Sequence, residues 1–138
     1  MDIDPRGPRF GALITTAVLV AVLITGSAWL LAVQAAVFAV GAIFGLRYAP
    51  YGLVYRYLVR PRLGPPNELE AEAPPRFAQG VGLAFAVVGV AGYATGLTAL
   101  GVVATAFALI AAFLNGAFGY CLGCEMYLLI RRMVPDRT

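Results

Sequence analysis

The sequence predicts an all-α membrane protein: four transmembrane helices arranged as two parallel-repeat hairpins, with two short amphipathic interfacial helices. Hydrophobic residues make up 61% of the 138 residues, and charged residues only 12%. Two long stretches, residues 10–46 and 77–120, contain no charged residue at all. Since one helix needs roughly 20 apolar residues to cross the hydrocarbon core, each stretch has room for two spans. The same composition argues against a soluble globular domain.

The first hairpin is predicted over residues 10–46. Its first span covers residues 10–25, and the following "TGSAW" sequence forms a tight turn. The second span covers residues 28–46 and ends before Pro50, which disfavours further helix. A cleaved signal peptide is the competing interpretation of the first span, but this apolar stretch continues directly into a second one. We therefore expect the first helix to be retained.

The second hairpin begins after Arg76. Its first span runs to about residue 95, where "TGLT" forms a second short turn, and its second span runs to about residue 119. Unbroken helix over residues 97–130 would be about 50 Å long at 1.5 Å per residue, which exceeds the thickness of the bilayer. The sequence therefore predicts a break in the helix at residues 115–119.

The two halves of the chain share landmarks. The motif "PRF" opens each hairpin, at residues 8–10 and again at 75–77. Each hairpin is followed by a short amphipathic segment that ends in arginine, at residues 51–60 and 124–132. Because a two-span hairpin returns to the side on which it started, the halves are expected to be parallel repeats about an axis along the membrane normal.

A single integral membrane domain, residues 1–138, is therefore predicted. Repeat one covers about residues 8–60 and repeat two about 76–134. Between them, residues 61–75 contain five prolines and three glutamates. This segment is expected to be a polar, extended loop that forms no helix through its proline pairs, and a linker rather than a docking site.

The arginines predict the orientation in the membrane. All ten basic residues are arginine, and each lies at a terminus or in the central segment. They are Arg6, Arg9, Arg47, Arg56, Arg60, Arg62, Arg76, Arg131, Arg132 and Arg137. By the positive-inside rule, we expect a multi-pass protein of the cell (plasma) membrane with both termini, the central loop and the pair Cys121 and Cys124 cytoplasmic. The net charge of +3 then reports topology and contact with anionic lipid, and gives no reason to expect nucleic acid binding.

Cys121 and Cys124, the only two cysteines, form a Cys-x-x-Cys motif. At the start of a helix, two sulfurs at this spacing come close enough to form a disulfide, and the helix N-terminus stabilises the first thiolate. Because Gly119 interrupts the helix just before Cys121, we expect Cys121 to be the exposed nucleophile and Cys124 the resolving thiol. Glu125 is expected to relay a proton or simply to favour the helix start.

Other roles for the cysteines remain open at this stage. They are small hydrophobes when buried, and a structural disulfide is disfavoured on the reducing cytoplasmic side. A metal is the main rival, but zinc takes four ligands and the chain has no histidine. A metal site would therefore need Cys121 and Cys124 from each subunit of a dimer. The spans also lack the ionisable residues typical of coupled transport, although a passive pore formed by an oligomer remains an alternative.

Polar and cationic groups near the membrane edge are weaker candidates for a functional site than the cysteine pair. Asn115 ends the fourth span or lines a small polar pocket below the thiols, and nothing in the sequence supports a pocket for a quinone-like molecule. Arg56 and Arg60 accompany a cluster of tyrosines and are expected to contact lipid phosphates. The sharper alternative is that these two arginines flank the cysteine pair and bind an anion such as a sulfur oxyanion.

Three stretches carry a family resemblance: "LVRPRLGPP" at residues 58–66, "RFAQGVGLAF" at 76–85 and "FGYCLGCEMY" at 118–127. The chain resembles the domain-of-unknown-function 4395 family, which consists of short four-span membrane proteins common in actinobacteria. Its most specific element, Phe-Gly-x-Cys-x-x-Cys-Glu, is present at residues 118–125. Members of the family tend to be encoded beside, or fused to, thioredoxin-like and rhodanese-type sulfurtransferase proteins, which implies thiol redox or sulfur relay.

Together these observations predict a membrane thiol-redox or sulfur-relay protein that acts with a thioredoxin-like or rhodanese-type partner. Cys121 would attack a disulfide or accept a sulfane sulfur, Cys124 would resolve the mixed species, and Glu125 would assist proton transfer. Thiol–disulfide exchange needs no bound cofactor. The alternative is a non-enzymatic membrane subunit that binds metal across a dimer or forms a pore for small sulfur species, so the prediction leaves open whether the protein is an enzyme.

Overall fold

The computed structural model describes residues 2–4, 6–64 and 69–133, and the chain in this part is helical apart from two very short strands. Three of the described helices are long and apolar enough to cross a membrane: α1 (Arg6–Thr25), α5 (Ala73–Ala94) and α6 (Thr98–Phe118). The chain is therefore an all-helical membrane protein that associates with the lipid bilayer.

A shorter apolar segment lies between α1 and α5. It consists of α2 (Ala28–Ala39) and a π-helical turn, η1 (Val40–Phe44), that continues it. The Ser27 side chain caps α2 by accepting a hydrogen bond from the Leu30 backbone N–H at 3.1 Å. The segment ends at Gly45, whose φ of +108° a residue with a side chain rarely adopts. The sequence predicted one helix here and did not predict the π-helical turn.

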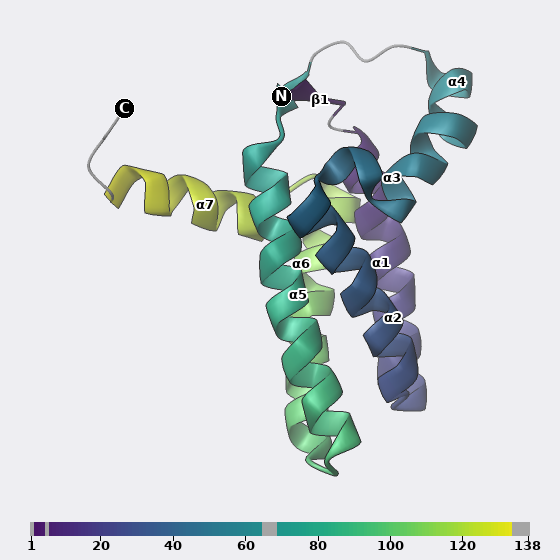
Figure 1. The fold of residues 1–138 in the computed structure, drawn as a ribbon, viewed down its shortest axis with the longest axis vertical. Helices are drawn as coiled ribbons and strands as arrows, with labels where there is room; N and C mark the ends of the chain where they lie inside the picture. Colours follow the sequence, from purple (N-terminus) through teal and green to yellow (C-terminus); the bar gives the residue numbers. More distant parts are fainter. Residues whose placement is uncertain (1, 5, 65–68, 134–138) are drawn as a thin grey trace.

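These four helical segments lie side by side (Figure 1). Helix α1 packs against α6, and α5 packs against both α2 and α6. The core consists of buried aliphatic and aromatic side chains from all of them: Leu19, Val22, Leu31, Phe38, Ala86 and Ala108. The polar side chain of Gln34 is fully buried, and its carboxamide donates to Thr15 and accepts from Tyr51. This pairing satisfies a group that would be costly to bury alone.

The turns lie where the sequence predicted them. Helix α1 ends at Thr25 and α5 at Ala94, so both short turns lie at one end of the bundle (Figure 1). Strand β1 (Asp2–Ile3) and the segments that follow η1 lie at the opposite end. The predicted break in the last helix is also confirmed, because α6 ends at Phe118 and Gly119 adopts a left-handed conformation with φ of +72°.

A chain of short helical segments follows η1 at the end of the bundle where β1 lies. Its members are η2 (Leu46–Tyr48), α3 (Pro50–Val54), a second π-helical turn η3 (Tyr55–Val59) and α4 (Arg60–Leu63). Segments α3 and η3 contact α1. The predicted amphipathic segment over residues 51–60 is therefore helical.

The prediction that residues 61–75 form no helix is wrong at both ends of that segment. Pro61 lies in α4, and Pro74 and Pro75 lie in the first turn of α5. Proline is accepted there because the first N–H groups of a helix need no intrahelical partner. Strand β2 (Glu70–Ala71) pairs antiparallel with β1. Residues 65–68 of this loop, and residue 134 at the predicted end of repeat two, lie outside the described residues.

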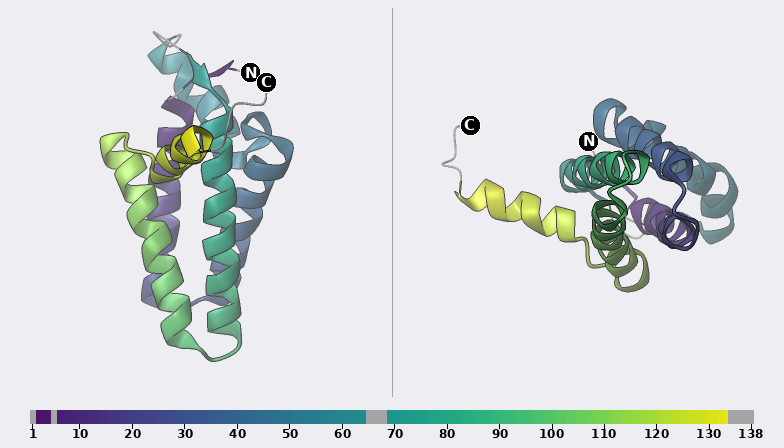
Figure 2. Two further views of the ribbon diagram at one scale, coloured as in Figure 1. Left: turned by 90° about the vertical axis from the view of Figure 1, so that its left-hand side faces the viewer. Right: turned by 90° about the horizontal axis from the view of Figure 1, so that it is seen from below.

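The last helix, α7 (Leu122–Met133), projects away from the bundle (Figures 1 and 2). Its start contacts α5, and its exposed side chains include Met126, Leu129 and Met133. Arg131 and Arg132 lie in its last turn. This helix matches the predicted amphipathic segment over residues 124–132.

Candidate functional site

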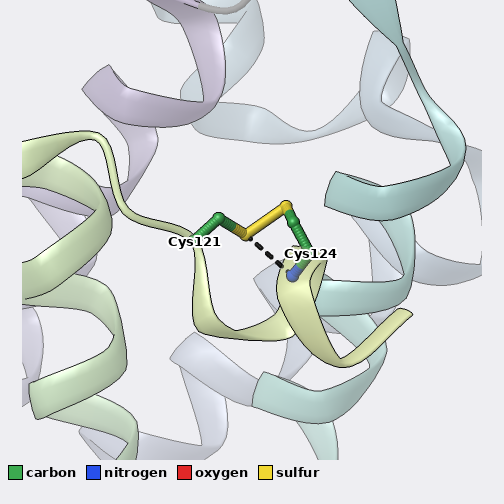
Figure 3. Close-up of a disulfide and its surroundings, with 2 residues drawn as sticks. All are labelled: Cys121 and Cys124. Atoms are coloured by element: carbon green, nitrogen blue, oxygen red, sulfur yellow. Dashed lines mark hydrogen bonds between the residues drawn. A yellow bond between two sulfur atoms is a disulfide. The ribbon is translucent and has the colours of Figure 1, made fainter. Parts of the chain in front are cut away.

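Cys121 and Cys124 are joined by a disulfide at the start of α7 (Figure 3). Their Cα atoms lie 5.1 Å apart, and both residues are half-buried. The backbone N–H of Cys124 donates to the sulfur of Cys121 at 3.1 Å, and the N–H of Glu125 donates to the Cys121 carbonyl at 3.0 Å. As predicted, Cys121 precedes the helix and Cys124 lies in its first turn. Cys121 was expected to be exposed but is half-buried, whereas Glu125 beside the pair is exposed.

The sequence before Cys121 creates the turn that presents the disulfide. Gly119 ends α6, and its N–H donates to the Asn115 carbonyl at 2.9 Å. The N–H of Tyr120 donates to the Leu114 carbonyl at 3.1 Å. Because these bonds satisfy the last carbonyl groups of α6, the chain turns away at once and α7 begins a few residues later.

The start of α7 is held against α5 by close packing. Gly123, between the two cysteines, is buried, and a Cβ atom there would lie 2.6 Å from the Cα of Ala78. One helical turn further, the ring of Tyr127 lies 5.6 Å from the ring of Phe77, centroid to centroid. The position of the disulfide therefore depends on a contact that only glycine permits.

Arg9 is a neighbour of the site that the sequence analysis did not single out. Its Nη2 atom lies 3.4 Å from the Gly116 carbonyl oxygen and 3.5 Å from that of Ala117. Its guanidinium carbon would be 3.5 Å from a Cβ atom at Gly119. A positive charge thus lies against the turn that precedes Cys121. The available signal was the position of Arg9 inside the repeated "PRF" motif.

Arg56 and Arg60 have partners of their own. Arg56 donates to the Arg47 carbonyl at 3.1 Å, and the Nε atom of Arg60 lies 3.8 Å from a carboxylate oxygen of Asp4. Among the described residues, neither arginine makes a hydrogen bond, ion pair or cation–π contact with Cys121 or Cys124. The proposed anion site beside the cysteine pair therefore remains a prediction.

Asp4 is the centre of a polar cluster near this end of the bundle. It accepts hydrogen bonds from the Arg6 guanidinium at 3.0 Å and from the Tyr55 hydroxyl at 3.1 Å. Burial acts to raise the pKa of Asp4, but the hydrogen bonds from Arg6 and Tyr55 outweigh it and lower that pKa below 3.8. The pKa of Tyr55 is raised, mainly by burial and next by its hydrogen bond to Asp4. The cluster fixes the N-terminal segment against η3.

A cavity of about 460 Å³ opens inside the same end of the bundle. Asn115 and Gly123 line it on the side of the disulfide, and Arg56 and Arg60 line it on the side of η3 and α4. Gln79 of α5 contributes a second carboxamide to its wall. The sulfur-bearing residues themselves are not among the lining residues, although Gly123 lies between them. Asn115 was predicted to line a polar pocket below the thiols, whereas Gln79 was not.

The described residues of a single chain do not provide a set of ligands for a metal ion. Within residues 2–4, 6–64 and 69–133, no group of three or more His, Cys, Asp or Glu residues is placed to hold a metal ion. The alternative that combines Cys121 and Cys124 of two subunits stays a prediction.

Comparison with known proteins identifies one family. The family model described as "Domain of unknown function (DUF4395)" matches residues 3–132, which is nearly the whole chain. No curated protein and no solved structure matches the sequence.

Proposed function

Because the chain belongs to the DUF4395 family, which its motif predicted, we propose that it is a membrane thiol-redox or sulfur-relay protein. Its Cys121–Cys124 pair would cycle between disulfide and dithiol, or accept a sulfane sulfur, with a thioredoxin-like or rhodanese-type partner. One observation carries this proposal: the two cysteines already form a disulfide at a helix start. A short loop of this kind adds little to stability, so its natural use is chemistry.

The roles of the residues follow from their places on α7. A Cys121 thiolate lies before the first turn, where unpaired backbone N–H groups and the helix dipole stabilise negative charge. Cys121 attacks the partner's disulfide or sulfane sulfur. After attack on a disulfide, Cys124, whose Cα lies 5.1 Å away, displaces the partner thiol by forming the intramolecular disulfide. After transfer of a sulfane sulfur the partner thiol has already left, and the same attack on the Cys121 persulfide releases hydrogen sulfide. Glu125 is exposed beside the pair and accepts or returns the proton.

In this proposal the chain crosses the membrane four times, as two parallel-repeat hairpins. A reciprocal pair of contacts supports the repeat. Arg9, in the first "PRF" motif, reaches carbonyl groups at the end of α6, while Arg76, in the second, donates to the Ala42 and Ile43 carbonyls in η1 at 2.8 and 2.7 Å. Two aromatic pairs, Phe10 with Tyr55 and Phe77 with Tyr127, are also equivalent.

The orientation in this proposal places both termini and the cysteine pair on the cytoplasmic side. The positive-inside rule supports it, because every arginine lies at a terminus or in the central segment. Segments η2 to α4 and helix α7 then lie in the cytoplasmic interface, where Arg56 and Arg60 contact lipid phosphates or a small anion. Arg137 belongs to this set but lies outside the described residues.

The test is to trap the partner. With a thioredoxin-like protein as the probe, Cys124→Ser should accumulate a mixed disulfide through Cys121, because the resolving thiol is missing. Cys121→Ser should form no such adduct. Non-reducing gels and intact mass measure both. Wild-type behaviour by both variants would refute the proposal, and stoichiometric zinc in the purified protein would favour the metal-binding alternative.

A further inference from the structure

The cavity beside the disulfide has the size and composition of a small-molecule site. Its volume of about 460 Å³ falls within the roughly 300–1,000 Å³ typical of ligand pockets. Phe38 of α2, Phe85 of α5 and three alanines of α6 contribute apolar surface. Charged and hydroxyl-bearing side chains, among them Asp4, Arg47 and Tyr51, line it as well. A ligand in it would therefore meet apolar and aromatic surface together with polar side chains.

Two carboxamides distinguish this cavity from a simple packing defect. Gln79 on α5 and Asn115 on α6 both line it, so donors are offered by two different helices. The carboxamide of Gln34, by contrast, is satisfied within the protein by Thr15 and Tyr51. Among the side-chain hydrogen bonds of the described residues, none uses the carboxamide of Gln79 or Asn115. In a membrane bundle, where water is scarce, such groups favour a ligand that carries hydrogen-bond acceptors.

The chemistry of the walls favours a neutral ring over a charged or purely aliphatic ligand. Each charged side chain in the wall has a contact within the protein. Arg60 is paired with Asp4, Arg56 donates to the Arg47 carbonyl, and the Arg47 guanidinium lies over the ring of Tyr48, 5.3 Å from its centroid. An acyl chain has no acceptor for the carboxamides. A quinone has two carbonyl oxygens on opposite edges of a flat apolar ring, which suits donors on two helices and aromatic walls.

Building on the proposed thiol function, we propose that this cavity binds the head group of a membrane quinone, which oxidises the Cys121–Cys124 dithiol. Two S–H bonds break and one S–S bond forms. The two electrons and two protons convert the quinone carbonyls into the hydroxyls of a hydroquinone. Gly123 lies in the cavity wall between the two cysteines, so the ring would be held beside the reacting sulfurs.

The test uses reduced, purified protein under oxygen-free conditions and a benzoquinone with a short alkyl tail as the probe. We expect saturable oxidation, with one disulfide formed for each quinone reduced, read by intact mass and by quinone absorbance. Removing both donors with Gln79→Leu/Asn115→Leu should raise the half-saturating quinone concentration at least about tenfold, given the usual strength of two hydrogen bonds. Thr16→Val is the control, because the Thr16 hydroxyl bonds to the Ala12 carbonyl and does not line the cavity.

Equal half-saturating quinone concentrations in the Gln79→Leu/Asn115→Leu variant and the wild type would overturn the quinone site.

A variant with Cys121→Ser and Cys124→Ser separates the quinone inference from the proposed thiol function, because it keeps the cavity but cannot exchange electrons. If it fails to bind the probe in equilibrium dialysis while the wild type still exchanges with a thioredoxin-like protein, the quinone inference fails and the proposed function stands. If it binds the probe but the wild type exchanges with no such partner, the proposed function fails instead. Displacement of the probe by a fatty acid at equal affinity would also overturn the quinone assignment.

Discussion

At the scale of single residues, Gly123 controls how closely the disulfide approaches the bundle. A Cβ atom at this position would lie 2.6 Å from the Cα of Ala78, which is backbone and cannot move aside. We expect Gly123→Ala to lower the free energy of unfolding by about 1–2 kcal/mol, since overpacking outweighs the gain in helix propensity. It should also increase alkylation of the reduced cysteines. Thermal unfolding in detergent and timed alkylation measure these effects.

Gly80→Ala is the matched control for that substitution. It changes the same residue type on α5, but its Cβ atom would lie 3.9 Å from the Cβ of Ala42, an ordinary contact. The free energy of unfolding should change by less than about 0.5 kcal/mol in the destabilising direction. Equal destabilisation by both substitutions would contradict a special role for Gly123.

Asp4 makes a prediction about pH. Its pKa is lowered in the folded protein, so its carboxylate contributes stability above pH 3.8, and this contribution is lost as the pH falls through the lowered pKa. Asp4→Asn should therefore destabilise the protein at neutral pH by about 1–2 kcal/mol, the usual value of hydrogen bonds to a charged group. The gap in melting temperature between wild type and variant should close in acid below pH 3.8. A gap that is constant with pH would show that the charge of Asp4 is not responsible.

The residues of the candidate site were predictable in type but only partly in arrangement. Cysteine spacing and the glycine before it were sufficient to place Cys121 ahead of α7 and Cys124 in its first turn. The neighbours Arg9 and Gln79 were not predicted as site residues, because they lie on α1 and α5, far away in sequence. Only packing of the helices brings such residues to one end of the bundle.

At the scale of helices, the reciprocal arginine contacts should have unequal strengths. Arg76 donates to the Ala42 and Ile43 carbonyls at 2.8 and 2.7 Å, whereas the bonds of Arg9 are 3.4 and 3.5 Å long. We expect Arg76→Gln to lower the free energy of unfolding by about 1–2 kcal/mol, and Arg9→Gln by less than about 1 kcal/mol. Arg132→Gln, in the exposed last turn of α7, serves as the control. Chemical unfolding in detergent provides the comparison, and the reverse order would contradict this account.

Helix ends were predicted well where glycine or short turns decide them, as at Thr25, Ala94 and Phe118. Two features escaped prediction for physical reasons. Proline was treated as a helix breaker in residues 61–75, although it suits the first turn of a helix, as Pro61 and Pro74 show. The π-helical turns η1 and η3 shift the hydrogen-bond ladder without any distinctive residue, so the hydrophobic pattern carries no trace of them.

At the scale of the whole molecule, the number of membrane crossings can be tested with single cysteines. In a background with Cys121→Ser and Cys124→Ser, Thr25→Cys and Leu97→Cys should react with an impermeant alkylating reagent from the same side, and Arg62→Cys from the other. Right-side-out and inside-out vesicles provide the comparison. If the segment Ala28–Phe44 did not cross, Thr25→Cys and Leu97→Cys would label from opposite sides.

The crossed arginine contacts also have a consequence for biogenesis. Arg76 belongs to the second half of the chain, so the carbonyl groups at the end of η1 have no such donor when the first half leaves the ribosome. Until Arg76 has been synthesised, these carbonyl groups can bond only to water or to lipid head groups. The second half of the chain thus completes the hydrogen bonding of the first half. A truncated chain lacking it should be an insertion intermediate that quality-control proteases recognise.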